Sequence, residues 1–225
     1  MQPQTQDEER RQQIIAANME AAKPILSELL QVGFDIKLIE DLYHKRYDYR
    51  RAIPILLHWL PRVENPDVKE VIVRALSVPW ARHTEAPALL VEEFRRSEGD
   101  SGLKWAIGNA LSVVADDDVL SDIIGLIKDP THGKAREMLV VALGNMKTPD
   151  VKYFLIELLD KEDLVGHAIV ALRKLKAKEA RPAIERFLTH PKSWVRREAK
   201  KALARIDKMS EKEASSKGKK AITQK

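Results

Sequence analysis

The feature that most constrains the fold of this chain is one helical pattern that occurs five times. In SWVRREAKKALARI, residues 193–206, apolar side chains fall at i, i+4, i+7 and i+8, on one face of an α-helix. Four earlier segments repeat the pattern and end in the same Ala-Leu pair. The alanines of the five pairs are Ala75, Ala110, Ala142, Ala171 and Ala202. Their spacing of 29 to 35 residues predicts two-helix units.

A second set of amphipathic segments, about ten residues each, lies between these helices. Three of them carry a proline in the first turn, where the missing N–H costs little: Pro54, Pro87 and Pro182. Three are preceded by a carboxylate that we expect to cap free backbone N–H groups: Asp118, Asp150 and Glu179. The three consecutive aspartates 116–118 are also compatible with a metal site, but we favour capping because no other type of metal ligand recurs nearby.

The composition agrees with an all-α chain that has no β-sheet. Of the 225 residues 44% are hydrophobic and only 5% aromatic, and β-branched residues do not alternate with polar ones. The chain has no cysteine, which excludes disulfides, thiolate metal sites and a cysteine nucleophile. The N-terminus lacks an apolar signal region, and no apolar stretch is long enough to span a membrane. We therefore expect a soluble, cytoplasmic protein with no membrane partner.

The sequence divides into three parts. Residues 1–47 predict helices that cap the N-terminal edge of the repeats, and residues 48–206 contain the repeats. Residues 207–225 lose the periodicity and fill with Lys, Ser and Glu, which predicts a disordered basic tail.

Charge is unevenly distributed along the chain. Residues 1–172 contain 21 Lys and Arg against 28 Asp and Glu, a net charge of −7. Residues 173–225 contain 18 against 6, a net charge of +12. The chain is therefore a dipole, and its C-terminal region is suited to an acidic partner.

The phrases NPDVKEVIVRALS, DLVGHAIVALRKL and SWVRREAKKALARI, together with the proline-bearing helices, resemble HEAT repeats. The short repeat form is similar to that of the phycobilisome-lyase HEAT-like proteins. The resemblance covers residues 48–206 and implies a right-handed α-solenoid of about five two-helix repeats. It leaves the function open, because the family includes scaffolds, bilin lyase subunits, deoxyhypusine hydroxylases and alkylpurine DNA glycosylases.

The enzymatic branches of that family find little support in the residues. The hydroxylases bind two irons with His-Glu pairs, and none of the six histidines here is followed by Glu. No HExxH, GxSxG, GxGxxG or P-loop motif occurs either. We therefore predict that the chain is not an enzyme and has no catalytic residue, metal or cofactor.

Tryptophans line the basic groove of the glycosylases, but the four tryptophans here occupy different positions in the repeat. For Trp59 and Trp105 we expect packing in the core or between repeats. Trp80 lies in SVPWARHTE, the connection that makes the first repeat spacing the longest. Inserted connections of this kind often contact partners, so Trp80, Arg82 and His83 are candidate binding residues. The alternative is an anchored loop that shields the core.

Basic residues follow two patterns. Lys69, Lys104, Arg136 and Arg196 come directly after the opening apolar position of a repeat, where we expect them to link neighbouring layers. The C-terminal repeat instead concentrates positive charge, which either serves as a polar cap or binds a partner. The candidates for binding are Arg181, Arg197, Lys200 and Lys201, together with Tyr153 and Arg186 on the concave face.

Two functions remain open from the sequence. The first is a non-catalytic scaffold or adaptor that binds another protein with an acidic surface. The second is a nucleic-acid-binding protein that places its basic C-terminal repeats on phosphates. The negative charge of residues 1–172 favours the first, because a groove that follows a duplex would carry positive charge throughout.

Overall fold

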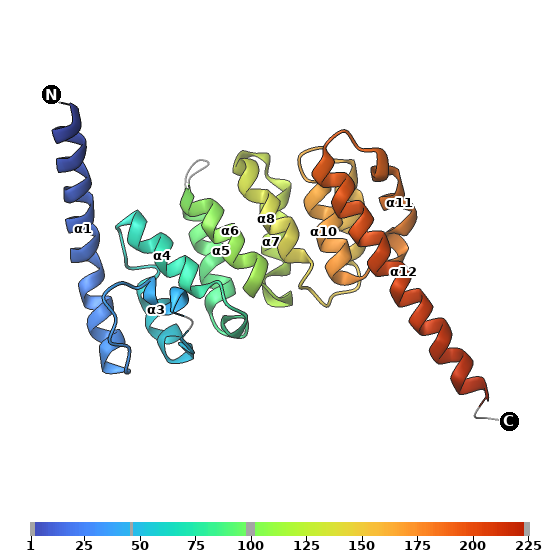
Figure 1. Cartoon of the computed structure of the whole chain (residues 1–225), viewed down its shortest axis with the longest axis horizontal. Coiled ribbons are helices and arrows are strands. Elements are labelled where there is room, and N and C mark those ends of the chain that lie inside the picture. The colour runs from blue at the N-terminus through green and yellow to red at the C-terminus, as the bar shows by residue number, and fades with distance from the viewer. Residues whose placement is uncertain (1–2, 46, 98–101, 223–225) are drawn as a thin grey trace. The chain divides into compact units, whose positions relative to one another are not determined.

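The computed structural model describes residues 3–45, 47–97 and 102–222, and for residues 3–5 and 210–222 it describes the backbone alone. The described chain contains twelve α-helices and seven short 3-10 segments and no strand, which confirms the all-α prediction (Figure 1). The chain divides into two compact units, residues 1–114 and 115–225.

The first unit contains six helices and a core that extends from α1 to α6. Helix α1 packs against α3 and α4, and α4 and α5 both pack against α6. The helices are α1 (Pro3–Gln31), α2 (Asp41–His44), α3 (Ile53–Trp59), α4 (Pro66–Leu76), α5 (Ala86–Arg96) and α6 (Gly102–Val114). Two 3-10 segments join them, η1 (Arg50–Ala52) and η2 (Pro79–Ala81).

The second unit also contains six helices. Helix α10 packs against α8, α9 and α12, while α7 packs on α8 and α11 on α12. The helices are α7 (Leu120–Lys128), α8 (Arg136–Leu143), α9 (Val151–Glu157), α10 (Val165–Leu175), α11 (Arg181–Glu185) and α12 (Ser193–Ile222). Five 3-10 segments precede or follow them: η3 (Asp117–Val119), η4 (Pro130–Ala135), η5 (Leu158–Asp160), η6 (Lys178–Ala180) and η7 (Arg186–Thr189).

The repeated Ala-Leu pairs lie in the core of both units. They fall on α4 and α6 in the first unit and on α8, α10 and α12 in the second. All five alanines are fully buried, and all five leucines are buried as well. A small side chain beside a large one allows two helices to approach closely while the leucine fills the remaining space. The periodicity of the sequence therefore predicted which helical faces are buried.

Three of the four basic residues after the opening apolar positions link one predicted two-helix repeat to the next, as expected, whereas Lys69 pairs with Glu93 inside its own predicted repeat, at 2.7 Å. Lys104 is 3% exposed, and its Nζ donates to the Ser97 carbonyl at the end of α5, at 2.7 Å. Arg136 Nη1 donates to the Ile127 carbonyl in the last turn of α7, at 3.1 Å. Arg196 Nη1 donates to the His190 carbonyl after η7, at 2.6 Å. Lys104, Arg136 and Arg196, which we call the basic clamps, thus bind carbonyls that a helix end leaves without a partner.

The capping prediction was wrong for the aspartates before α7 and α9. The 3-10 turn η3 precedes α7, and Asp116 caps this turn, because its carboxylate accepts from Asp118 N at 3.3 Å. Asp117 accepts from the backbone N–H groups of Lys147 and Thr148, at 3.0 and 2.9 Å. Burial alone would raise the pKa of Asp117, but the hydrogen bonds from Thr148 and Lys147 keep it below its usual value.

The carboxylates of Asp150 and Glu179 also do not cap a helix. Asp150 occupies the N-cap position of α9 without a side-chain hydrogen bond to the helix. Glu179 lies inside η6, where its carboxylate forms an ion pair with Lys152. The hydrogen bond from Lys152 is the main reason that the pKa of Glu179 is lowered. The Glu179 carboxylate therefore links η6 to Lys152 of α9, and the Asp150 carboxylate does not contribute to the cap of α9.

The end of helix α12 differs from the disordered tail that the sequence predicted for residues 207–225. Its backbone stays helical to Ile222, so it includes residues 207–222, for which the sequence predicted disorder (Figure 1). Lys, Glu and Ala favour a helix even without an apolar face, whereas the prediction relied on the loss of periodicity. Residues 223–225 of the predicted tail lie outside the described chain.

Candidate protein-binding surfaces

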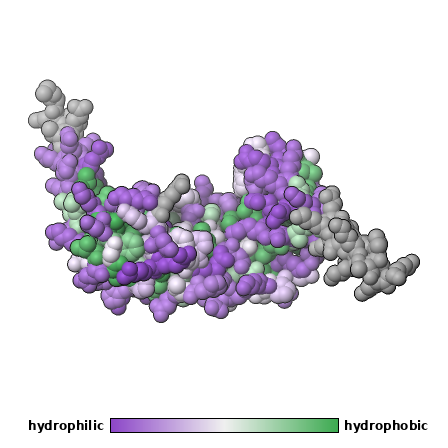
Figure 2. Space-filling view, turned by 60° about the horizontal axis from the view of Figure 1, so that its bottom comes forward, coloured by the Kyte–Doolittle hydropathy of each residue, from purple (hydrophilic) through white to green (hydrophobic). Residues whose placement is uncertain are grey.

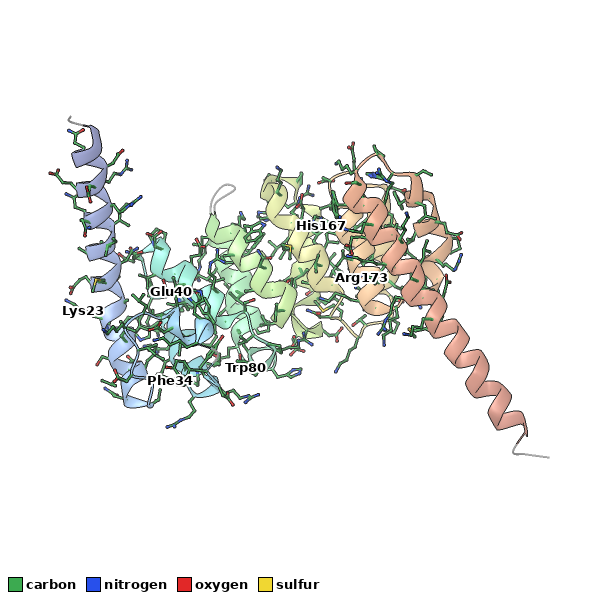
Figure 3. All side chains as sticks on the ribbon, in the orientation of Figure 1. Lys23, Phe34, Glu40, Trp80, His167 and Arg173 are labelled. Atoms are coloured by element: carbon green, nitrogen blue, oxygen red, sulfur yellow. The ribbon has the colours of Figure 1, made fainter. Side chains whose placement is uncertain are left out.

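Trp80 lies in the first unit, where it forms part of an open hollow. The residue belongs to η2 and is half-buried (Figure 3). Its ring meets Tyr49 edge-on, with 5.5 Å between the ring centres. The Arg50 guanidinium carbon lies over the Trp80 ring, 5.1 Å from its centre. Trp80 Nε1 is buried without a hydrogen-bond partner among the atoms that the structure describes.

The hollow beside Trp80, which we call the Trp80 hollow, has a volume of about 660 Å³. Helix α3 and the chain after it supply one wall, and the beginning of α5 supplies another. Its apolar lining consists of Ile53, Pro54, Leu57, Pro61 and Leu89. Its polar lining consists of Arg50, His58, Arg62, Thr84 and Glu85. An apolar floor with aromatic and arginine side chains at its edge is typical of the centre of a protein interface.

The two other candidates of the Trp80 connection have different environments. Arg82 is half-buried, and its Nη2 donates to the Val113 carbonyl in the last turn of α6, at 2.6 Å. This contact supports the alternative interpretation of an anchored loop for Arg82. His83 is exposed at the surface next to it. The sequence pointed to this connection but missed Tyr49 and Arg50, which hold the Trp80 ring and come from a distant segment.

Trp105 was predicted to pack in the core or between repeats, and the prediction of a core position was wrong. Trp105 lies on α6 and is 47% exposed, because it stands two residues after the opening apolar position and faces away from the core. Trp59 is half-buried, and its Nε1 is enclosed by protein. Trp194 packs between helices instead: it lies against Gly166 of α10, with its ring centre 5.2 Å from that of His167.

Tyr153 lies exposed on α9, whereas the candidates Arg181 and Arg186 are engaged in ion pairs. Lys152 Nζ is 5.2 Å from the centre of the Tyr153 ring. Arg186 Nη2 is 2.5 Å from Asp160 Oδ1. Arg181 pairs with Asp207 at 2.8 Å and also with Glu185, and these hydrogen bonds raise the pKa of Arg181. The charges of Arg181 and Arg186 are therefore largely neutralised within the second unit.

The three candidates on α12 are exposed, as expected for the outer face of a last repeat. Lys201 Nζ lies 2.7 Å from Glu198 Oε1. Arg197 and Lys200 have no ion-pair partner among the side chains that the structure describes. The core side of the same helix is formed by Val195, Ala199 and Ala202, all fully buried.

The N-terminal helices leave apolar side chains at the surface, where the sequence predicted a cap. Ile14, Ile15 and Met19 of α1 are exposed, and hydrophobic residues are visible at the surface in Figure 2. A hollow of about 420 Å³ lies beside them, between α1, the segment 37–40 and α4. Its lining is mainly apolar and includes Leu26, Leu38 and Val71.

Known proteins supply no function for this chain. Its comparison with protein-family models, with curated proteins and with solved structures finds no match. The described residues contain no group of three or more His, Cys, Asp or Glu able to hold a metal ion. None of the described helices is long and apolar enough to cross a membrane. The exposed surfaces of the two units are therefore the features from which we infer a function.

Proposed function

We propose that this chain is a non-catalytic scaffold that binds another protein. We further propose that its helices form a right-handed α-solenoid of about five HEAT-type repeats. The buried Ala-Leu pairs on five helices and the basic clamps support the repeat architecture. Repeats of this kind present their second helices as an extended binding surface.

The Trp80 hollow is the observation that carries the binding function. Interface energy concentrates in a few tryptophan, tyrosine and arginine residues that line well-packed pockets. Trp80 and Arg50 both line the hollow, next to proline, leucine and isoleucine side chains, while the buried Tyr49 supports the Trp80 ring from the core side. Catalysis would require converging nucleophilic or acid–base groups, whereas this hollow offers mainly apolar contact area.

A nucleic-acid-binding protein is the second candidate function. The net charge of +12 in residues 173–225 favours it. Against it stand the net charge of −7 in residues 1–172 and the internal ion pairs of Arg181 and Arg186. A partner protein with an acidic surface fits the same C-terminal charge without requiring positive charge along the whole chain.

Affinity purification from the native cell, with and without nuclease, tests the proposal. We expect the full chain to retain the same partner protein after nuclease treatment. Trp80→Ala and His58→Glu should reduce its capture, because the first removes the anchor and the second places a carboxylate at the exposed rim of the hollow. Trp105→Ala, which removes an exposed tryptophan of the same unit, is the matched control and should retain the partner.

The circular dichroism and melting temperature of each variant establish that it is folded. Loss of the partner on nuclease treatment would contradict the scaffold proposal and support the nucleic-acid alternative. Equal capture by the parent, Trp80→Ala and His58→Glu would show that the Trp80 hollow is not the binding surface.

A further inference from the structure

A further hollow lies in the second unit, and its described lining is almost entirely basic. It has a volume of about 530 Å³. Six basic side chains and one alanine line it: Arg173, Lys174, Lys176, Lys201, Ala204, Arg205 and Lys208. We call it the basic hollow; Arg173 at its wall is labelled in Figure 3. Among the candidate residues from the sequence, only Lys201 belongs to this lining.

The end of α10 and the middle of α12 build the basic hollow. Arg173 and Lys174 come from the last turn of α10, and Lys176 follows as its C-cap. Lys201, Arg205 and Lys208 recur at i, i+4 and i+7 and therefore share one face of α12. Ala204 between them is small, which leaves room beneath the basic side chains.

Lys176 has a left-handed backbone, with φ 56° and ψ 40°, and is the one described non-glycine residue with positive φ. Glycine is the preferred residue after a helix that ends in this way, because a Cβ is disfavoured there. The lysine thus occupies a position where glycine would favour folding, and its side chain extends the basic lining. A lysine at a position that favours glycine indicates that the positive charge of Lys176 contributes to the binding properties of the hollow.

Three cations of the lining, Lys176, Arg205 and Lys208, have no ion-pair partner among the side chains that the structure describes. Glu198 is mostly buried, and its Oε1 lies 2.7 Å from Lys201 Nζ. Its Oε2 lies 3.5 Å from Arg173 Nη2, while Arg173 Nε is buried without a partner among the described atoms. Among the described residues, the lining contains no carboxylate. Its side chains of like charge repel each other, so an anion that binds between them is stabilised.

The chemistry of the lining favours carboxylates over a nucleic acid. Proteins that bind single strands stack the bases on aromatic side chains, and the lining contains no aromatic residue. A long nucleic acid would also require positive charge beyond the hollow, whereas residues 1–172 carry a net charge of −7. Four lysines and two arginines can instead hold several carboxylates of a short flexible segment.

We propose that the basic hollow binds a short acidic segment of a partner protein through its Asp and Glu side chains. This proposal rests on the proposed scaffold function and assigns it a second contact, separate from the Trp80 hollow. The contact is electrostatic, so it accelerates association and weakens with added salt.

Fluorescence anisotropy of the purified full chain tests the proposal. The probe is a fluorescein-labelled peptide of six consecutive glutamates flanked by glycine and serine. Arg205→Glu/Lys208→Glu should weaken its binding by about tenfold or more at low ionic strength. Arg197→Glu/Lys200→Glu, the matched control, reverses two exposed charges of the same helix outside the hollow and should change affinity by less than about threefold.

A third variant separates binding from stability. Lys176→Gly should weaken binding of the hexaglutamate peptide, while its melting temperature stays equal to that of the parent or rises. A purely structural role for Lys176 would leave peptide binding unchanged. Trp80→Ala should bind the peptide as the parent does, so failure of the partner capture assay and failure of this proposal are distinguishable.

Three outcomes would overturn the proposal. The parent fails to bind the hexaglutamate peptide at low ionic strength, or both charge-reversed pairs lose binding equally, which would indicate a response to net charge alone. The third is tighter binding of a fluorescein-labelled oligouridylate, lost in Arg205→Glu/Lys208→Glu, which would make a nucleic acid the occupant.

Discussion

Replacing Gly166 by alanine tests the close contact between α10 and α12. A Cβ at this position would lie 1.9 Å from Cη2 of Trp194 and 2.2 Å from Cζ3. The indole ring would have to move by about 1.5 Å to reach an ordinary contact distance of 3.4 Å. It cannot do so freely, because the next residue, Val195, is fully buried and fixes the start of α12.

The expected change in the free energy of unfolding of Gly166→Ala is the difference between two opposing contributions. Added atoms in a packed interior cost about 1–3 kcal/mol, while alanine in place of glycine favours a helix by about 1 kcal/mol. We therefore expect Gly166→Ala to lower the free energy of unfolding by up to about 2 kcal/mol. The corresponding decrease in melting temperature is up to about 8 °C for a chain of this size.

Gly125→Ala is the matched control, because Gly125 is also helical, in α7 of the same unit, and a Cβ there meets nothing within 4 Å. This variant should be stabilised by about 0.5–1 kcal/mol. Urea unfolding followed by circular dichroism measures both variants. Equal stabilities for Gly166→Ala and Gly125→Ala would refute the packing of Trp194 on Gly166, and so would an unchanged cost of Gly166→Ala in a Trp194→Ala background.

Three further variants test the core and two buried titratable groups. Leu143→Ala should cost about 2–5 kcal/mol in urea unfolding, because Leu143 is fully buried, and an unchanged midpoint would show that the repeat frame is wrong. Burial lowers the pKa of His167, so its contribution to stability is complete above about pH 6.5 and is lost as the pH falls. The urea midpoint of His167→Gln should therefore decrease less on acidification than that of the parent. Burial also raises the pKa of Tyr49 to about 12, so stability should fall as the pH rises above about 10. Tyr49→Phe should lack the tyrosine that ionises last in an ultraviolet absorbance titration.

The buried helical faces could be predicted from the sequence because apolar periodicity directly decides which side of a helix leaves water. The Ala-Leu pairs and the basic clamps follow from that periodicity. The caps could not be predicted, because the 3-10 turn η3 precedes α7 and is itself capped by Asp116, which leaves Val119 at the N-cap position of α7. Trp105 shows a related difficulty, since an offset of two residues from the template turns its side chain to the solvent.

The candidate surfaces were predictable only in part. Trp80 stood out because its connection is long, but its neighbours Tyr49 and Arg50 come from a segment about thirty residues earlier. The excess of C-terminal charge was visible in composition, whereas its distribution was not. The basic hollow requires the left-handed conformation of Lys176 and the position of α12 beside α10, and both depend on tertiary packing. The excess of basic residues in the sequence therefore made Arg197 and Lys200 candidates for binding, although they lie outside the lining of the basic hollow.

The basic clamps donate to main-chain carbonyls, which every amino acid carries. A substitution at an acceptor position such as Ser97 or His190 therefore leaves the acceptor of the clamp in place. The positions that support helix stacking are thereby separated from the positions that a partner can contact. During evolution the exposed ends of the second helices can change their side chains and acquire new partners, while the same three cations continue to hold the helices together.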